Sequence, residues 1–196
     1  MAEIKSTLEL VLERAAAMGR ASKEDMEAEE LVKEGMRLGG EYIRTEKGTL
    51  EELLSQVPLS RLPQVRKGVL ATLLRNVILP KNEEQQTLAE KAIEGVMQLS
   101  GRATDLAALL KDLKQILLHY RQTREQVYKR LETEFSQQME IMEQSVARQT
   151  GVKVRLDASQ HPKFQEQWQK VQVDLNGQYG RALEQHKALL KQRLGG

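Results

Sequence analysis

The stretch from about Ala103 to Thr150 contains neither glycine nor proline, the two residues that most often interrupt a helix. Its apolar side chains recur in alternating steps of three and four residues, a spacing typical of a coiled-coil seam. The series runs through Leu106, Leu110, Leu113, Leu117, Tyr120, Val127 and Leu131, with Arg124 at one seam position, and continues in steps of four as Phe135, Met139, Met142 and Val146. A helix of this length spans roughly 70 Å. We therefore expect it to project from the rest of a small protein.

A second long helix is predicted after Pro162, which suits the first position of a helix because proline lacks the N–H that would be unpaired there. Between the two helices, Gly151 ends the first, and Val152–Leu156 alternates apolar and basic residues as a strand does. The last helix carries an apolar series of its own, although Gly177 and Gly180 weaken its middle. We expect a long antiparallel hairpin over residues 102–196, with a short extended segment at a tip near 151–161.

The first 101 residues predict several shorter helices. Capping residues and glycines divide the opening region into helices over Ser6–Met18 and from Ser22 to about Thr45. Three further helices are expected over Leu50–Val57, from Pro63 to just before Pro80, and from Asn82 to about Leu99. Gly35 and Gly39 lie one turn apart, a spacing that permits two helices to pack closely. The fold class is thus all-α, with an N-terminal helical bundle over 1–101 and the coiled-coil-like hairpin over 102–196.

Composition limits the classes of protein that fit this chain. The absence of cysteine excludes a disulfide scaffold and cysteine-ligated metal sites. No stretch approaches the ~20 apolar residues of a transmembrane helix, and the opening residues lack the pattern of a signal peptide. We expect a cytoplasmic protein without a transmembrane segment.

Charge is distributed unevenly although the net charge is only +2. Residues 1–56 hold 13 acidic and 8 basic residues, whereas Arg61–Lys81 holds five basic residues and no acidic one. Residues 152–196 hold 8 basic and 4 acidic residues. The acidic and basic regions either dock on one another or form solvated faces.

No catalytic, metal or cofactor motif is found in the sequence. His119, His161 and His186 are not in the spacing of metal ligands, and no glycine-rich phosphate loop or nucleophile elbow occurs. We therefore expect no cofactor and no enzymatic activity.

Two groups of residues are candidates for binding. At the hairpin tip, basic side chains lie close in sequence to aromatic ones, a combination that protein interfaces use. These candidate partner-binding residues are Lys153, Arg155, His161, Lys163, Phe164 and Trp168. The alternative is that Phe164 and Trp168 only hold the turn together. The second group is a candidate assembly seam, Leu106, Leu110, Leu113 and Leu117, which the N-terminal bundle or another subunit must cover.

The opening residues Met1–Arg14 (MAEIKSTLELVLER) and the later Glu29–Gly35 (EELVKEG) resemble a family of uncharacterised bacterial helical proteins. That resemblance implies a bacterial cytosolic protein with no assigned function. In shape alone, a long hairpin with a small tip is similar to the stalk subunits of rotary ATPases and to prefoldin tentacles.

These observations favour a scaffold or interaction protein that binds another protein, or a second copy of itself, through the hairpin or its tip. The first alternative is peripheral binding to nucleic acid or a membrane surface through the basic half, although the net charge makes nucleic acid and membrane unlikely partners. The second alternative is a small-ligand site or enzyme within the helical bundle.

Overall fold

The structure is a computed structural model that describes residues 7–45, 48–101, 103–151 and 157–195. Within these ranges the chain is all-α, as predicted, with six α-helices, one turn of 3-10 helix and no strand. The elements are α1 (Thr7–Arg44), α2 (Leu50–Ser55), α3 (Leu62–Asn76), α4 (Glu83–Leu99), α5 (Thr104–Thr150), η1 (Ala158–Gln160) and α6 (Pro162–Leu194).

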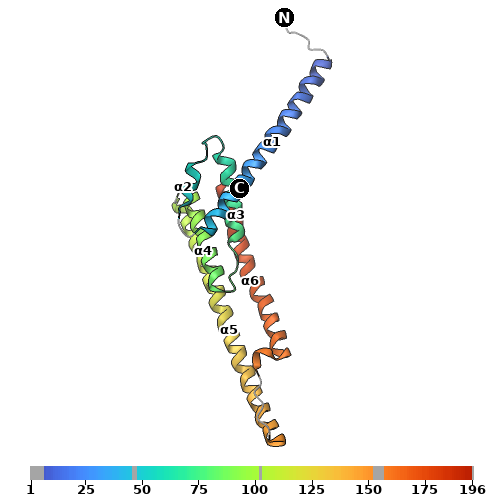
Figure 1. Cartoon of the computed structure of the whole chain (residues 1–196), viewed down its shortest axis with the longest axis vertical. Helices are drawn as coiled ribbons and strands as arrows, with labels where there is room; N and C mark the ends of the chain where they lie inside the picture. The colour runs from blue at the N-terminus through green and yellow to red at the C-terminus, as the bar shows by residue number, and fades with distance from the viewer. Residues whose placement is uncertain (1–6, 46–47, 102, 152–156, 196) are drawn as a thin grey trace.

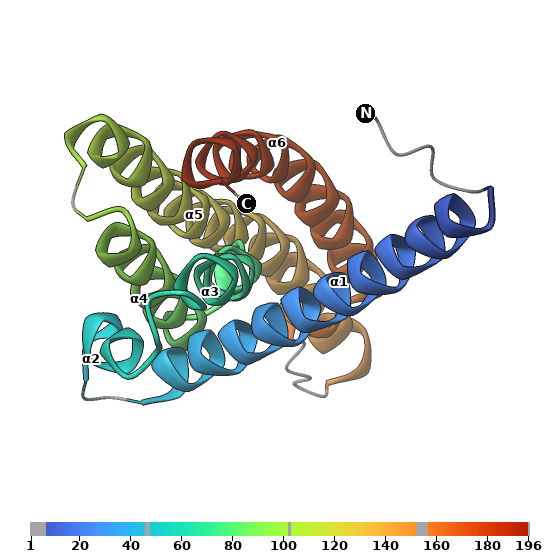
Figure 2. The same cartoon turned by 90° about the horizontal axis from the view of Figure 1, so that it is seen from above.

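The molecule is elongated along α5, as Figure 1 shows. Helices α2, α3 and α4 gather around the beginning of α5, and α6 returns antiparallel beside it. Helix α1 crosses α3 and then projects away from the other helices toward its N-terminus; seen from above, it lies as a bar across the molecule (Figure 2). The predicted extended segment at the tip, residues 152–156, lies outside the described residues.

Local sequence signals set several helix boundaries where they were predicted. The Thr49 hydroxyl accepts a hydrogen bond from the Glu52 amide at 3.2 Å, and the Glu52 carboxylate accepts one from the Thr49 amide at 3.1 Å, which completes a capping box. The Asn82 side chain caps α4 by accepting from the Gln85 amide at 2.9 Å. Pro162 opens α6, and Gly151 ends α5 in the left-handed region at φ 72°.

The predicted break near Gly19 is wrong, because α1 is one helix of 38 residues. A single glycine costs a helix about 1 kcal/mol relative to alanine, which neighbouring strong helix formers can offset. Alanines at 15–17 and 21 flank Gly19 on both sides. The capping signal at Ser22 is therefore overridden by continuous helix.

Helices α1 and α3 cross in close contact, and this contact depends on glycine. A Cβ atom on Gly35 would lie 2.0 Å from the carbonyl oxygen of Val65, and one on Gly68 would lie 1.9 Å from that of Val32. Gly39 faces Thr72, whose hydroxyl donates to the Met36 carbonyl at 3.2 Å. The prediction that Gly35 and Gly39 permit close packing is confirmed.

One hydrophobic core joins the bundle to the near half of the hairpin. The four leucines of the candidate assembly seam are all buried in it, together with Leu183 and Leu190 of α6 and residues of α1 to α4. The sequence predicts that either the N-terminal bundle or another subunit covers this seam. In the structure the bundle of the same chain covers it. The core therefore crosses the predicted domain boundary at residue 101.

We predict that Gly68→Ala lowers the free energy of unfolding by about 3 kcal/mol, because the new methyl group overpacks against the α1 backbone. Gly177→Ala is the matched control: a Cβ there meets nothing within 4 Å, so the gain in helix propensity raises stability by about 0.5–1 kcal/mol. Urea unfolding followed by circular dichroism measures both. Equal effects of the two substitutions would show that the crossing is not tight in solution.

Candidate functional site

The far half of the hairpin has a second hydrophobic cluster, separate from the core of the bundle. Helix α5 contributes Leu131, Phe135 and Met139, whereas Phe164 and Trp168 come from α6 and Ala158 from η1. Tyr128 and Val171 pack against this cluster from the side nearer the bundle. We call the part of the hairpin from Tyr128 to the tip, with α6 up to Val171, the distal hairpin.

Aromatic rings hold the two helices of the distal hairpin together. Tyr128 meets the Trp168 ring at a centroid distance of 5.0 Å and the Phe164 ring at 5.6 Å, both nearly perpendicular. Phe135 meets Phe164 from the other side at 5.5 Å and 87°. Edge-to-face pairs of this kind contribute about 0.5–1.5 kcal/mol each beyond their buried area.

This packing corrects the prediction that Phe164 and Trp168 are contact residues at the tip. Phe164 is 0% exposed and Trp168 is 8% exposed, because both point at α5. A partner could touch them only after the helices separate. The sequence alternative, in which these rings hold the turn together, describes their position.

Some polar residues of the tip cap a helix, and others are exposed to solvent. The Nδ1 atom of His161 accepts a hydrogen bond from the Lys163 amide at 3.2 Å and so caps α6, while Lys163 itself is exposed. Asp157 accepts from the Ser159 hydroxyl at 2.7 Å and from the Ser159 amide at 2.9 Å, and these hydrogen bonds hold the pKa of its carboxyl below the usual value. Lys153 and Arg155 lie outside the described residues.

A polar layer separates the distal hairpin from the core of the bundle. The Tyr120 hydroxyl donates to the Asn176 side chain at 2.7 Å, and the hydroxyls of Thr123 and Tyr179 lie 3.0 Å apart. The rings of Tyr120 and Tyr179 meet at 5.5 Å with their planes at 71°. Burial raises the pKa of the Tyr120 hydroxyl, an effect that the nearby Arg124 charge partly offsets. These bonds fix which residues of α5 and α6 face one another.

Arg124, the residue that interrupts the apolar seam, connects three parts of the chain. Its guanidinium lies 5.2 Å from the centre of the Trp168 ring on α6 and donates to the Lys81 carbonyl, just before α4, at 3.3 Å. A cation over a tryptophan face is worth about 0.5–1 kcal/mol at a partly exposed site. The sequence shows that a charged residue interrupts the apolar seam at position 124. It does not indicate that this residue contacts Trp168 and Lys81.

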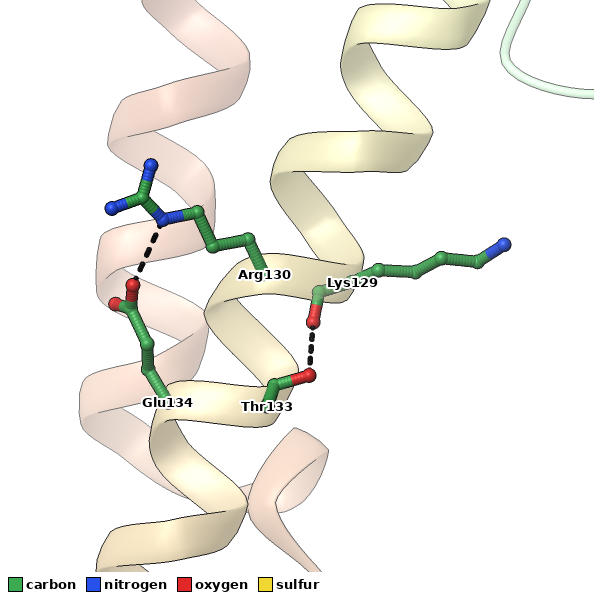
Figure 3. A network of polar contacts seen from close by, with 4 residues as sticks. All are labelled: Lys129, Arg130, Thr133 and Glu134. Atoms are coloured by element: carbon green, nitrogen blue, oxygen red, sulfur yellow. Dashed lines mark hydrogen bonds and ion pairs between the residues drawn. The ribbon is translucent and has the colours of Figure 1, made fainter.

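The outward face of α5 in this region is occupied by charged residues that pair within the helix. The Arg130 guanidinium lies 3.0 Å from the Glu134 carboxylate, and the Thr133 hydroxyl donates to the Lys129 carbonyl at 2.8 Å. Figure 3 shows both contacts on the same part of α5. Exposed pairs four residues apart stabilise a helix by only about 0.3–0.5 kcal/mol. This face therefore supports the helix rather than forming a site.

Helix α5 continues past the point where α6 begins. Phe135 packs on Phe164 in the first turn of α6, so the rest of α5 up to Thr150 extends roughly 20 Å further. Figure 1 shows this end of α5 as the lowest part of the molecule, with no other helix beside it. Ile141 is 69% exposed and Met142 is 51% exposed there. We call residues 140–151 the overhang.

The described grooves of the bundle are open to solvent. One of about 520 Å³ lies between α2, α3 and the end of α4, and a second of about 280 Å³ lies beside Tyr42 and Thr49. Among the described residues, no group of three or more His, Asp or Glu side chains is placed to hold a metal ion. Within the same residues, no helix is long and apolar enough to cross a membrane.

Comparison with known proteins gives one relationship. The model of a family described as a family of unknown function (DUF6657) matches residues 51–192, a range that runs from the first turn of α2 through α3, α4 and α5 to near the end of α6. This confirms the resemblance to a family without an assigned function, although the match lies outside the opening residues that suggested it. No curated protein and no solved structure matches the chain.

We predict that Phe164→Ala destabilises the distal hairpin by about 3–5 kcal/mol, because it leaves a cavity beside the rings of Tyr128 and Phe135. Hydrogen exchange should accelerate over residues 128–139 and 162–171 and remain slow in α3 and α4, since the two hydrophobic clusters are separate. Lys163→Ala, at an exposed neighbouring position, is the control. Faster exchange throughout the chain would mean that the clusters unfold as one unit.

We predict that Tyr120→Phe costs about 1 kcal/mol at neutral pH through loss of the hydrogen bond to Asn176. Because burial raises the pKa of Tyr120, its contribution is complete below the ordinary tyrosine value near 10 and is lost as pH rises through the folded-state pKa. The variant should therefore lose less stability than the wild type between pH 7 and pH ~11. Urea midpoints at the two pH values test this, and parallel losses would contradict it.

Proposed function

We propose that this chain, which belongs to the family of unknown function DUF6657, is a cytoplasmic, non-enzymatic scaffold protein that binds another protein through the overhang of its hairpin. The observation that carries this proposal is the pair of exposed apolar side chains, Ile141 and Met142, on a helix end that extends beyond its partner helix. Large exposed apolar side chains gathered at one projecting point favour contact with another protein.

The distal hairpin suits this role because packing between α5 and α6 orders the helix from which the overhang extends. Its own aromatic cluster fixes α5 against α6 immediately before the overhang begins. A binding element that is already ordered loses less conformational entropy on association, so more of its contact energy appears as affinity.

The surroundings of the apolar pair resemble the rim of a protein interface. Glu140, Gln144 and Arg148 are exposed around it, so a polar border encloses a small apolar centre. Met142 adds an unbranched and polarisable side chain that adapts to the shape of a partner. A nucleic acid would instead need several cations here, and among the described residues of the overhang Arg148 is the one basic side chain.

We predict that a photo-crosslinking amino acid at position 141 captures one partner of discrete mass in the native host cell. Position 173 is the matched control, because Val173 is similarly exposed at 64% but lies on α6 away from the overhang. The adduct at position 141 should disappear when Met142→Glu is added, since a charge in the apolar centre opposes binding, while the melting temperature stays unchanged.

Two results would contradict the proposal. Equal adducts at positions 141 and 173 would show that crosslinking reports only exposure. An adduct at position 141 that survives Met142→Glu would show that the apolar pair is not the contact.

A further inference from the structure

The part of α1 that projects beyond the other helices is rich in acidic residues. We call residues 7–30 of α1 the N-terminal arm; both views show it projecting beyond the other helices (Figures 1 and 2). Where the arm meets the bundle, residues 23–34 hold six acidic and two basic residues, and nearly all of these side chains are exposed. The scaffold function proposed for the opposite end of the molecule does not use this feature.

The acidic residues are only partly neutralised within the helix. Lys33 binds Glu30 at 2.9 Å and holds the pKa of that carboxyl below its usual value, and Lys23 lies 4.0 Å from Glu27. By contrast, Asp25 stands four residues before Glu29, a like-charge spacing that destabilises a helix by a few tenths of a kcal/mol. An acidic stretch on a projecting helix is attracted to a partner surface of opposite charge.

The complementary surface is the outer face of α3. From Arg61 to Lys81 the chain has five basic residues and no acidic one. Lys67 and Arg75 lie two turns apart on α3, and both are exposed.

The arm cannot reach this face in its own chain. Gly35 packs on Val65 and Gly39 packs on Val69 and Thr72, so α1 and α3 run in the same direction from their crossing. The arm therefore points away from Lys67 and Arg75, and α1 is an unbroken helix that cannot fold back. Of the basic residues in this stretch, Arg61 at the start of α3 shares an open groove with Glu27, Glu30 and Glu34.

We propose that the acidic N-terminal arm docks on the basic outer face of α3 in a second copy of this chain. Each copy carries both the arm and α3, so two copies that dock reciprocally use the same pair of surfaces and form a two-fold dimer. The acidic arm of each copy then contacts Lys67 and Arg75 of the other copy, which it cannot contact in its own chain.

The first test is the mass in solution, measured by light scattering after size-exclusion chromatography. At low salt the wild-type chain should have twice its monomer mass of 22.3 kDa, and at high salt it should return to the monomer as the charges are screened. A monomer at every salt concentration would overturn the proposal. So would a low-salt species that nuclease treatment returns to the monomer, because the basic face would then bind nucleic acid.

Charge reversal identifies the two surfaces. The arm variant Asp25→Lys/Glu29→Lys and the α3 variant Lys67→Glu/Arg75→Glu should each be monomeric at low salt, because like charges then face one another. A mixture of the two variants should recover the doubled mass, since the lysines introduced at positions 25 and 29 of one variant face the glutamates introduced at positions 67 and 75 of the other. Failure of the mixture to associate would overturn the pairing.

A control separates this pairing from a general effect of charge. Lys129→Glu/Arg130→Glu changes the net charge by the same amount as the α3 variant, at exposed positions of α5 (Figure 3). This control should remain a dimer at low salt, and a monomer here would also overturn the proposal. Circular dichroism should show all three variants with unchanged helix content, because every substituted side chain is exposed.

Discussion

The close crossing of α1 and α3 decides how the rest of the bundle is arranged. Gly35 and Gly68 bring the two backbones so near that no side chain fits between them. This contact sets the direction in which α1 leaves the bundle, and with it the position of the acidic stretch relative to the basic face of α3. A wider crossing would move Tyr42 and Ile43, the two buried core residues of α1, away from the rest of the core.

The sequence predicts where the helices begin and end better than it predicts which residues they contact. Capping residues such as Thr49 and Asn82, and Pro162 at a helix start, act within one turn, so their effect can be inferred locally. Gly19 shows the limit of local signals, because its penalty competes with the propensity of neighbouring alanines. Long apolar periodicity likewise predicted α5, since the absence of glycine and proline left no alternative.

Contacts between distant elements were harder to infer. The leucines at 106, 110, 113 and 117 were recognised as a seam, but only the fold shows that the bundle covers them. Phe164 and Trp168 have the composition of an interface, yet they face inward, since burial depends on the partner helix. The overhang was not predicted because it depends on where α6 begins relative to α5, a register that periodicity alone does not fix.

The polar layer at Tyr120 and Asn176 also limits how this hairpin can change in length. Its hydrogen bonds join one position of α5 to one position of α6, so residues added to a single helix beyond the layer would shift the aromatic rings out of alignment. Length can vary there only by matched insertions in both helices, near multiples of seven residues, which keep each apolar series on the same face. The reach of the hairpin can therefore evolve in discrete steps while its base stays the same.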